Sequence, residues 1–188
     1  MRRIMHIGLA VAVVAATTAL TRLNAGGKTA EPGKLGLEVV RFARSQLGKK
    51  VGNGECANLA VAALKSAGAK DTHDFGISGI DRDYRWGTPV ERYEDVQSGD
   101  IVQFRNVKIV IKTTFESDKG SGYRVETRRY PHHTSIIARN LGKGRFKVFE
   151  QNAGSAKSRA ERQKVQENDL SLAHMTEGKV WIYRPVKK

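Results

Sequence analysis

The order of the hydrophobic patterns constrains the fold of this chain most strongly. Two helical patterns come first: apolar residues fall four apart from Leu35 to Leu47, and a second apolar face runs from Cys56 to Ala67. Strand patterns follow from Ile101 onwards, separated by turn-rich segments. Helices that precede an antiparallel set of strands are typical of an α+β fold, in which the helices pack on the sheet. We therefore predict an α+β domain rather than a doubly wound parallel sheet.

Turn residues place the boundaries of these elements. The first helix is expected to end at Gly48 and the second at Gly68, because glycine favours helix ends. Weak periodicity from 71 to 94 predicts a structured loop region. The polar segment 157–172 is expected to be a loop or a short surface helix. The strand candidates are residues 101–104, 107–115, 123–130, 134–138, 146–149 and 180–183.

The amino-terminal segment is typical of an export signal. Arg2 and Arg3 precede an uncharged apolar run from Ile7 to Leu20. This run is shorter than the about 20 apolar residues of a membrane span, so none is expected after cleavage, although an uncleaved signal anchor is the alternative. We expect a secreted protein, or one in the periplasm or cell envelope. The predicted organisation is a signal peptide or anchor at 1–25, a linker at 26–33 and one domain at 34–188.

The chain is strongly basic, with 33 Lys and Arg against 19 Asp and Glu and a formal net charge of +14. Such a charge attracts anionic polymers, and an acidic cell-wall polymer is one candidate. The basic residues are spread along the chain, which is also the pattern of an ordinary soluble surface. Since no RNA-binding aromatic motif, zinc spacing or recognition-helix pattern is visible, nucleic acid is not an expected partner. We expect a monomer.

Cys56 is the single cysteine of the chain, so it has no partner for an internal disulfide. It is therefore a packing residue, an intermolecular partner or a reactive thiol. Its place in the first turn of a helix favours a thiolate, because the helix amino terminus carries partial positive charge. On this evidence alone, packing is the stronger interpretation, since free cysteine is among the most buried residues.

Polar residues that can activate a thiol occur downstream of Cys56. His132 and His133 precede one apolar strand, and Glu150, Gln151 and Asn152 end another. Strand alternation puts the two histidines on opposite faces, so only one of them can face the thiol. That imidazole would accept the thiol proton, and a third polar group would orient it. Adjacent histidines on opposite faces and a single cysteine provide no metal-ligand set.

Taken together, these motifs resemble the CHAP and NlpC-type amidases of the papain-like cysteine hydrolase superfamily. The resemblance runs from about Leu35 to Pro185. Closer still, the chain is similar to the cysteine-proteinase-fold domain at the carboxyl end of some fungal actin-patch scaffold proteins, which also occurs in small bacterial proteins. The first likeness rests on four motifs: Gly54-Glu55-Cys56, Ser98-Gly99-Asp100-Ile101-Val102-Gln103-Phe104, His133 before Thr134-Ser135-Ile136-Ile137, and Glu150-Gln151-Asn152. The closer likeness rests on Gly52-Asn53-Gly54-Glu55-Cys56, Trp86-Gly87, Gly99-Asp100-Ile101-Val102-Gln103-Phe104, His133-Thr134, Glu150-Gln151-Asn152 and Tyr183-Arg184-Pro185.

The resemblance implies Cys56 as nucleophile, His133 as general base, and Glu150 or Asn152 as the residue that orients the imidazole. It implies an amidase or endopeptidase with peptidoglycan peptides as the substrate class. The amino-terminal segment predicts that this activity lies outside the cytoplasm, and no cofactor or metal is expected. The chain departs from the pattern at Glu55, where CHAP enzymes commonly have Gln, and an inward carboxylate there would raise the thiol pKa. The alternative is a catalytically silent module of the same fold that binds a peptide or an anionic cell-wall polymer.

Three further residues are candidates to line a cleft beside the thiol. Tyr84 and Trp86 are large aromatic residues in the loop region, and Asp100 follows the glycine of a turn. A core role for the aromatic residues and a turn role for the aspartate are the stronger interpretations.

Overall fold

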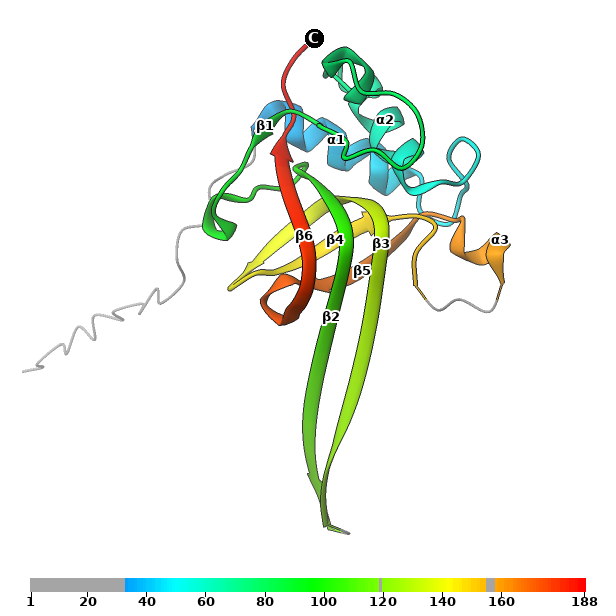
Figure 1. The fold of residues 1–188 in the computed structure, drawn as a ribbon. Coiled ribbons are helices and arrows are strands. Elements are labelled where there is room, and N and C mark those ends of the chain that lie inside the picture. The colour runs from blue at the N-terminus through cyan, green and yellow to red at the C-terminus, as the bar shows by residue number, and fades with distance from the viewer. Residues whose placement is uncertain (1–32, 119, 155–157) are drawn as a thin grey trace, which may run out of the picture.

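Two helices pack against an antiparallel sheet in this computed structural model, which describes residues 33–118, 120–154 and 158–188 (Figure 1). The predicted signal peptide and all of the predicted linker except Gly33 lie outside the described residues. The helices are α1 (Lys34–Ser45) and α2 (Cys56–Ser66), and the strands follow in the order β1-β6-β2-β3-β4-β5 across the sheet. The prediction of an α+β fold is confirmed. The strands are β1 (Thr88–Pro89), β2 (Ile101–Ser117), β3 (Gly120–Gly142), β4 (Arg145–Glu150), β5 (Gln166–Ser171) and β6 (Met175–Arg184).

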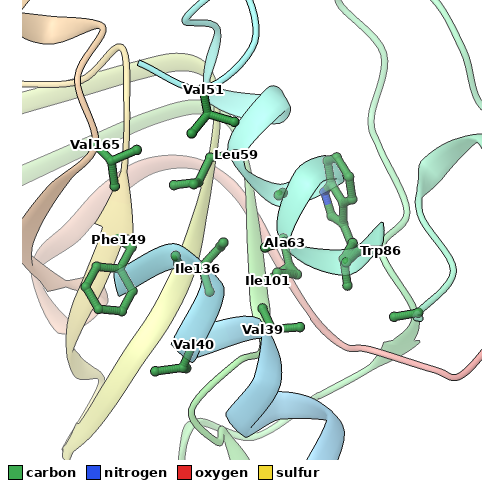
Figure 2. Packing of buried hydrophobic residues seen from close by; sticks show 14 of the residues in the cluster. Val39, Val40, Val51, Leu59, Ala63, Trp86, Ile101, Ile136, Phe149 and Val165 are labelled. Atoms are coloured by element: carbon green, nitrogen blue, oxygen red, sulfur yellow. The ribbon is translucent and has the colours of Figure 1, made fainter. Parts of the chain in front are cut away.

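The two helices begin and end within three residues of the predicted bounds, and each buries its apolar stripe. Helix α1 buries Val39, Val40 and Ala43, while α2 buries a matching set that includes Leu59 and Ala63. Figure 2 shows Val39, Val40, Leu59 and Ala63 packed with the sheet residues Ile101 and Ile136 and with Trp86 in one core. Burial of each such aliphatic side chain contributes roughly 1.5–3 kcal/mol, so this contact fixes α2 and its first residue on the sheet.

Helix α1 lies in direct backbone contact with the turn that precedes β2. A Cβ on Gly36 would lie 2.5 Å from the Ser98 carbonyl oxygen, which is closer than real Cβ atoms approach. On the other side, Gly99 has φ +92°, and a Cβ there would lie 2.4 Å from the Gly36 Cα. Both glycines are therefore required for this approach, since any side chain would push the helix away from the sheet.

Strands β2 and β3 form one long hairpin that extends beyond the rest of the sheet (Figure 1). The sequence predicts two separate strands in each arm, and this prediction is wrong because irregular residues interrupt the pattern without ending the strand. Asn106 has φ +52°, a conformation that asparagine tolerates, and the pairing of β2 with β6 shifts there. Pro131 has no N–H to donate to a neighbouring strand. It is tolerated because β4 pairs with β3 only from Ile136 onwards, so the edge of β3 at Pro131 that would face β4 has no strand partner in the described chain.

The polar segment 157–172 contains a strand that the sequence prediction missed. A short helix, α3 (Arg159–Arg162), is followed by β5, which pairs along its whole length with β4. Only Leu170 of β5 is fully buried, so the edge strand lacks the apolar alternation by which strands are recognised. The prediction of a short helix or loop is right for the first half and wrong for the second.

The region from 71 to 94 is the expected loop, with 3₁₀ turns η1 (Thr72–Phe75) and η2 (Tyr93–Asp95) beside β1; a third turn, η3 (Leu172–His174), precedes β6.

A second apolar cluster covers the face of the sheet opposite the helices and includes Phe104, Tyr130 and Phe146. Among residues 33–118, 120–154 and 158–188, no helix is long and apolar enough to cross a membrane. Two cores, one on each face, thus enclose the strands that carry the predicted site.

Candidate active site

Cys56 is the first residue of α2 and is only partly buried. The preceding residue, Glu55, is the N-cap, and its extended backbone leads from the glycine-bearing turn into the helix. The N–H groups of a first helical turn have no intrahelical acceptor, and together with the helix dipole they favour a negative charge at this position. The thiol is therefore placed where a thiolate is stabilised and a reagent can reach it.

His133 lies on β3 with only 4% of its surface exposed, and its Nε2 is 2.7 Å from Glu150 Oε2. The imidazole also forms a hydrogen bond with the Cys56 thiol. Since Nε2 faces the carboxylate, Nδ1 is the ring nitrogen left for the sulfur. Phe104 and Tyr130 flank the ring at centroid distances of 5.6 and 5.3 Å. The imidazole is thus held between two partners in a defined orientation.

Glu150 ends β4 and is buried to the same degree as His133. Its second oxygen, Oε1, accepts a hydrogen bond of 2.9 Å from Asn168 Nδ2 on β5. Both carboxylate oxygens are therefore satisfied, which a buried charge requires. Asn168 was missed in the sequence because β5 itself was missed, and no motif signals it. The structure brings together Cys56, His133, Glu150 and Asn168 from one helix and three strands.

The electrostatics of this group favour a thiolate and an imidazolium. Burial raises the pKa of Cys56, but the hydrogen bond and charge of His133 and the N–H groups of Thr134 and Ala57 bring it below its ordinary value. Burial alone would lower the pKa of His133, yet its hydrogen bonds with Cys56 and Glu150 raise it to about 10. For the Glu150 carboxyl, burial raises the pKa. The hydrogen bonds from His133 and Asn168 and the charge of His133 outweigh burial, so the pKa of Glu150 is lowered. Proton transfer from sulfur to imidazole is thus favoured before any substrate binds.

Of the two residues expected to orient His133, the structure brings Glu150 to the ring and places Asn152 elsewhere. Asn152 Nδ2 donates a hydrogen bond of 2.8 Å to Glu55 Oε2, and Arg159 Nη2 lies 4.0 Å from Glu55 Oε1. The Glu55 carboxylate is therefore drawn toward the surface, with about half of its side chain exposed. The inward carboxylate that would raise the thiol pKa is not the arrangement found.

Gln151 has a positioning role that the sequence did not reveal. Alternation along the strand points it away from the imidazole, and its fully buried amide reaches the loop before α2. Oε1 accepts from the Val51 N–H at 3.2 Å, while Nε2 donates to the carbonyl oxygens of Val51 and Glu55 at 3.0 and 2.7 Å. The residue that follows Glu150 thus fixes the backbone that precedes Cys56.

The remaining candidates have structural roles. Trp86 is fully buried, and its Nε1 donates to Gln103 Oε1 at 3.1 Å. Asp100 is buried too and pairs with Arg184 at 3.0 Å. Tyr84 packs edge-on to Trp86, and its hydroxyl donates to the Gly79 carbonyl oxygen at 2.8 Å. Burial and, after it, the charge of Cys56 raise the pKa of Tyr84.

His132 turns away from the thiol, as alternation predicts. Its Nε2 lies 2.6 Å from the Arg82 carbonyl oxygen, and its ring contacts Tyr84. In the part of the chain that the structure describes, no group of three or more His, Cys, Asp or Glu side chains is arranged to hold a metal ion.

Comparison with known proteins identifies the fold family. Residues 29–188 match the AIM3/BBC1 cysteine proteinase-fold domain. A relative from Debaryomyces hansenii, "Altered inheritance of mitochondria protein 3", is 27% identical over 167 residues, which cover 84% of this chain and 16% of that protein. The chain thus spans about one sixth of the length of this relative. No solved structure matches the chain significantly. The match over most of the chain confirms the likeness to the cysteine-proteinase-fold domain of the fungal proteins, and the chain belongs to the AIM3/BBC1 cysteine proteinase-fold domain family.

Proposed function

We propose that this chain is a cysteine amidase or endopeptidase that hydrolyses amide bonds through Cys56, His133 and Glu150. The observation that carries the proposal is the continuous hydrogen-bonded series of thiol, imidazole and buried carboxylate, with the thiol partly exposed at a helix amino terminus. A nucleophile, a base that contacts it and a third group that orients the base are the parts that covalent catalysis requires.

The reaction follows from these positions. The Cys56 thiolate attacks the carbonyl carbon of an amide, and an S–C bond forms as the oxygen becomes an oxyanion. N–H groups of the first turn of α2 are the candidate donors to that oxyanion. The imidazolium of His133 gives its proton to the amine nitrogen as the C–N bond breaks. Water then attacks the thioester, His133 takes the water proton, and the acid leaves with the thiolate restored.

The proposed substrate is peptidoglycan, and the proposed location is outside the cytoplasm. A likeness to CHAP and NlpC-type amidases favours peptidoglycan peptides, and an exported protein is proposed from the apolar run at Ile7–Leu20. The net charge of +14 supports attraction to an anionic cell-wall polymer, which would raise the local substrate concentration.

A catalytically silent binding module is the second candidate, and Glu55 favours it. Its carboxylate accepts hydrogen bonds and has no donor to offer an oxyanion when ionised, whereas the Gln commonly found in CHAP enzymes has an amide N–H. Glu55 therefore leaves oxyanion stabilisation to other donors, such as the backbone N–H groups of the first turn of α2. Loss of one oxyanion donor typically lowers kcat by about 10²–10³-fold, so the replacement of that Gln by Glu55 could by itself leave the site almost inactive.

Cys56→Ala separates the two candidates. The assay measures hydrolysis of purified peptidoglycan fragments and of a panel of coumarin-amide peptides, together with labelling by a fluorescent iodoacetamide. We expect wild type to release product and to label faster when native than when denatured, and Cys56→Ala to do neither while keeping its unfolding temperature. Binding of peptidoglycan fragments that survives Cys56→Ala, with no product from wild type, would instead establish the binding module. Equal labelling of native and denatured wild type would contradict an activated thiol.

A further inference from the structure

The outer edges of two strands, β3 and β5, face each other across a cavity of about 640 Å³. Five successive residues of β3, Glu126–Tyr130, and four of β5, Gln166–Asp169, line it. Because side chains alternate between faces along a strand, lining by successive residues means that the backbone edges themselves border the cavity. We call this cavity the edge slot.

Neither edge has a strand partner in the described chain. β5 is the last strand of the sheet and pairs only with β4. β3 pairs with β2 on its inner side and with β4 only from Ile136 onwards, so its outer edge at 126–130 is unpaired. An unpaired strand edge presents a row of main-chain donors and acceptors that can pair with another extended chain.

A side chain already uses one of these main-chain groups. Arg128 crosses from β3, and its Nη1 donates to the Asp169 carbonyl oxygen on β5. The Asp169 carbonyl oxygen is an acceptor that an added strand could use. Its bond with Arg128 shows that this oxygen faces the slot and can accept a hydrogen bond there. The same guanidinium contacts Glu126, so its charge is partly neutralised and it does not make the slot an anion site.

We propose that the edge slot binds an extended peptide segment, which adds to the sheet through main-chain hydrogen bonds. The volume lies within the roughly 300–1,000 Å³ typical of ligand pockets. Five β3 residues at about 3.3 Å each offer an edge of some 16 Å, enough for four or five residues of an added strand. Main-chain recognition of this kind selects an extended conformation more than a sequence.

The slot is separate from the thiol but adjoins the group that orients the base. Glu150 and Asn168 line it, whereas Cys56 and His133 do not. A peptide in the slot is thus an exosite ligand, and its binding does not depend on turnover. It would also shield the Glu150 carboxylate from water on the side away from His133.

Hydrogen exchange on the full chain tests the slot directly. Cys56→Ala protein is used throughout, because it cannot hydrolyse the probe and retains every slot residue. The probe is a capped random hexapeptide library, and the control is the same library N-methylated at alternate residues. We expect amides within 126–130 and 166–169 to exchange about tenfold more slowly at a library concentration about ten times the dissociation constant. The methylated library should have no such effect, since it cannot complete the main-chain pairing.

Blocking variants complete the test. Thr127→Trp and Gln166→Trp, one on each lining strand, should abolish the protection. Thr114→Trp, an exposed threonine of the same hairpin that does not line the slot, should retain it. No protection by the unmethylated library, equal protection by the methylated one, or protection that persists in both blocking variants would overturn the proposal. None of these outcomes bears on hydrolysis, so this proposal and the proposed function can fail separately.

Discussion

Glu150 bonds His133 diagonally across the sheet, at 2.7 Å between Oε2 and Nε2. Ile136 of β3 is paired with Phe149 of β4, and continuing that antiparallel register would set Asn152 opposite His133. The chain departs from the register instead: β4 ends at Glu150, and Asn152 has φ +57°. Glu150 lies two positions before Asn152, and this diagonal neighbour is the residue whose side chain contacts His133.

Glu150→Gln should weaken the site without unfolding it. The amide keeps nearly the same shape but removes the negative charge that raises the His133 pKa, so the imidazolium is less stable and the thiolate fraction falls. We expect kcat/KM and the rate of thiol alkylation at pH 7 to drop by about 10²-fold or more. Asn152→Gly is the matched control, because glycine tolerates φ +57° and the lost amide bonds Glu55 rather than His133. A loss in Asn152→Gly as large as that in Glu150→Gln would contradict the assignment.

Gln151→Met should destabilise the loop before α2. The variant keeps the length of the side chain but leaves the Val51 N–H and two carbonyl oxygens without this amide. Each buried polar group left unpaired costs about 1–3 kcal/mol, and partial hydration reduces the sum, so we expect a loss of about 2–4 kcal/mol in urea unfolding. Gln97→Met, at the turn before β2, should change stability by less than about 0.5 kcal/mol. Equal stability of the two variants would show that Gln151 does not hold the loop.

Gly36→Ala should separate α1 from the turn before β2. The added methyl group would lie 2.5 Å from the Ser98 carbonyl oxygen, so backbone has to move. Overpacking of this kind typically costs about 1–3 kcal/mol, which calorimetry would record as a lower unfolding temperature. At Gly33, by contrast, nothing lies within 4 Å of the added atom, and Gly33→Ala should cost no more than about 1 kcal/mol at this N-cap. A Gly36 variant as stable as the Gly33 variant would refute the close approach.

The two helices and the α+β class could be predicted because each leaves a local pattern, and the sequence motifs name Cys56, His133 and Glu150 as candidates. Apolar residues at helical spacing mark α2, and Cys56 falls at its start whatever lies downstream. The orienting residue could not be decided, because Glu150 and Asn152 share a strand face and only the left-handed backbone at Asn152 separates them. Asn168 could not be predicted, because β5 has an almost wholly polar sequence and was not recognised as a strand. The contact of Gln151 with a loop 100 positions away in the sequence leaves no local pattern from which it could be predicted.

The pH dependence of Cys56 alkylation by iodoacetamide tests the central claim, the thiolate and imidazolium pair, most directly. The thiol pKa is lowered and that of His133 is raised to about 10, so the pair exists from the lowered thiol pKa up to about pH 10. We expect the rate in wild type to rise with an inflection clearly below about pH 8.5, the value of an unperturbed thiol. His133→Gln should move the inflection to or above pH 8.5, because burial then acts with little to offset it, while His132→Gln should leave it unchanged. A wild-type inflection at or above pH 8.5, or one that His133→Gln does not move, would contradict the account.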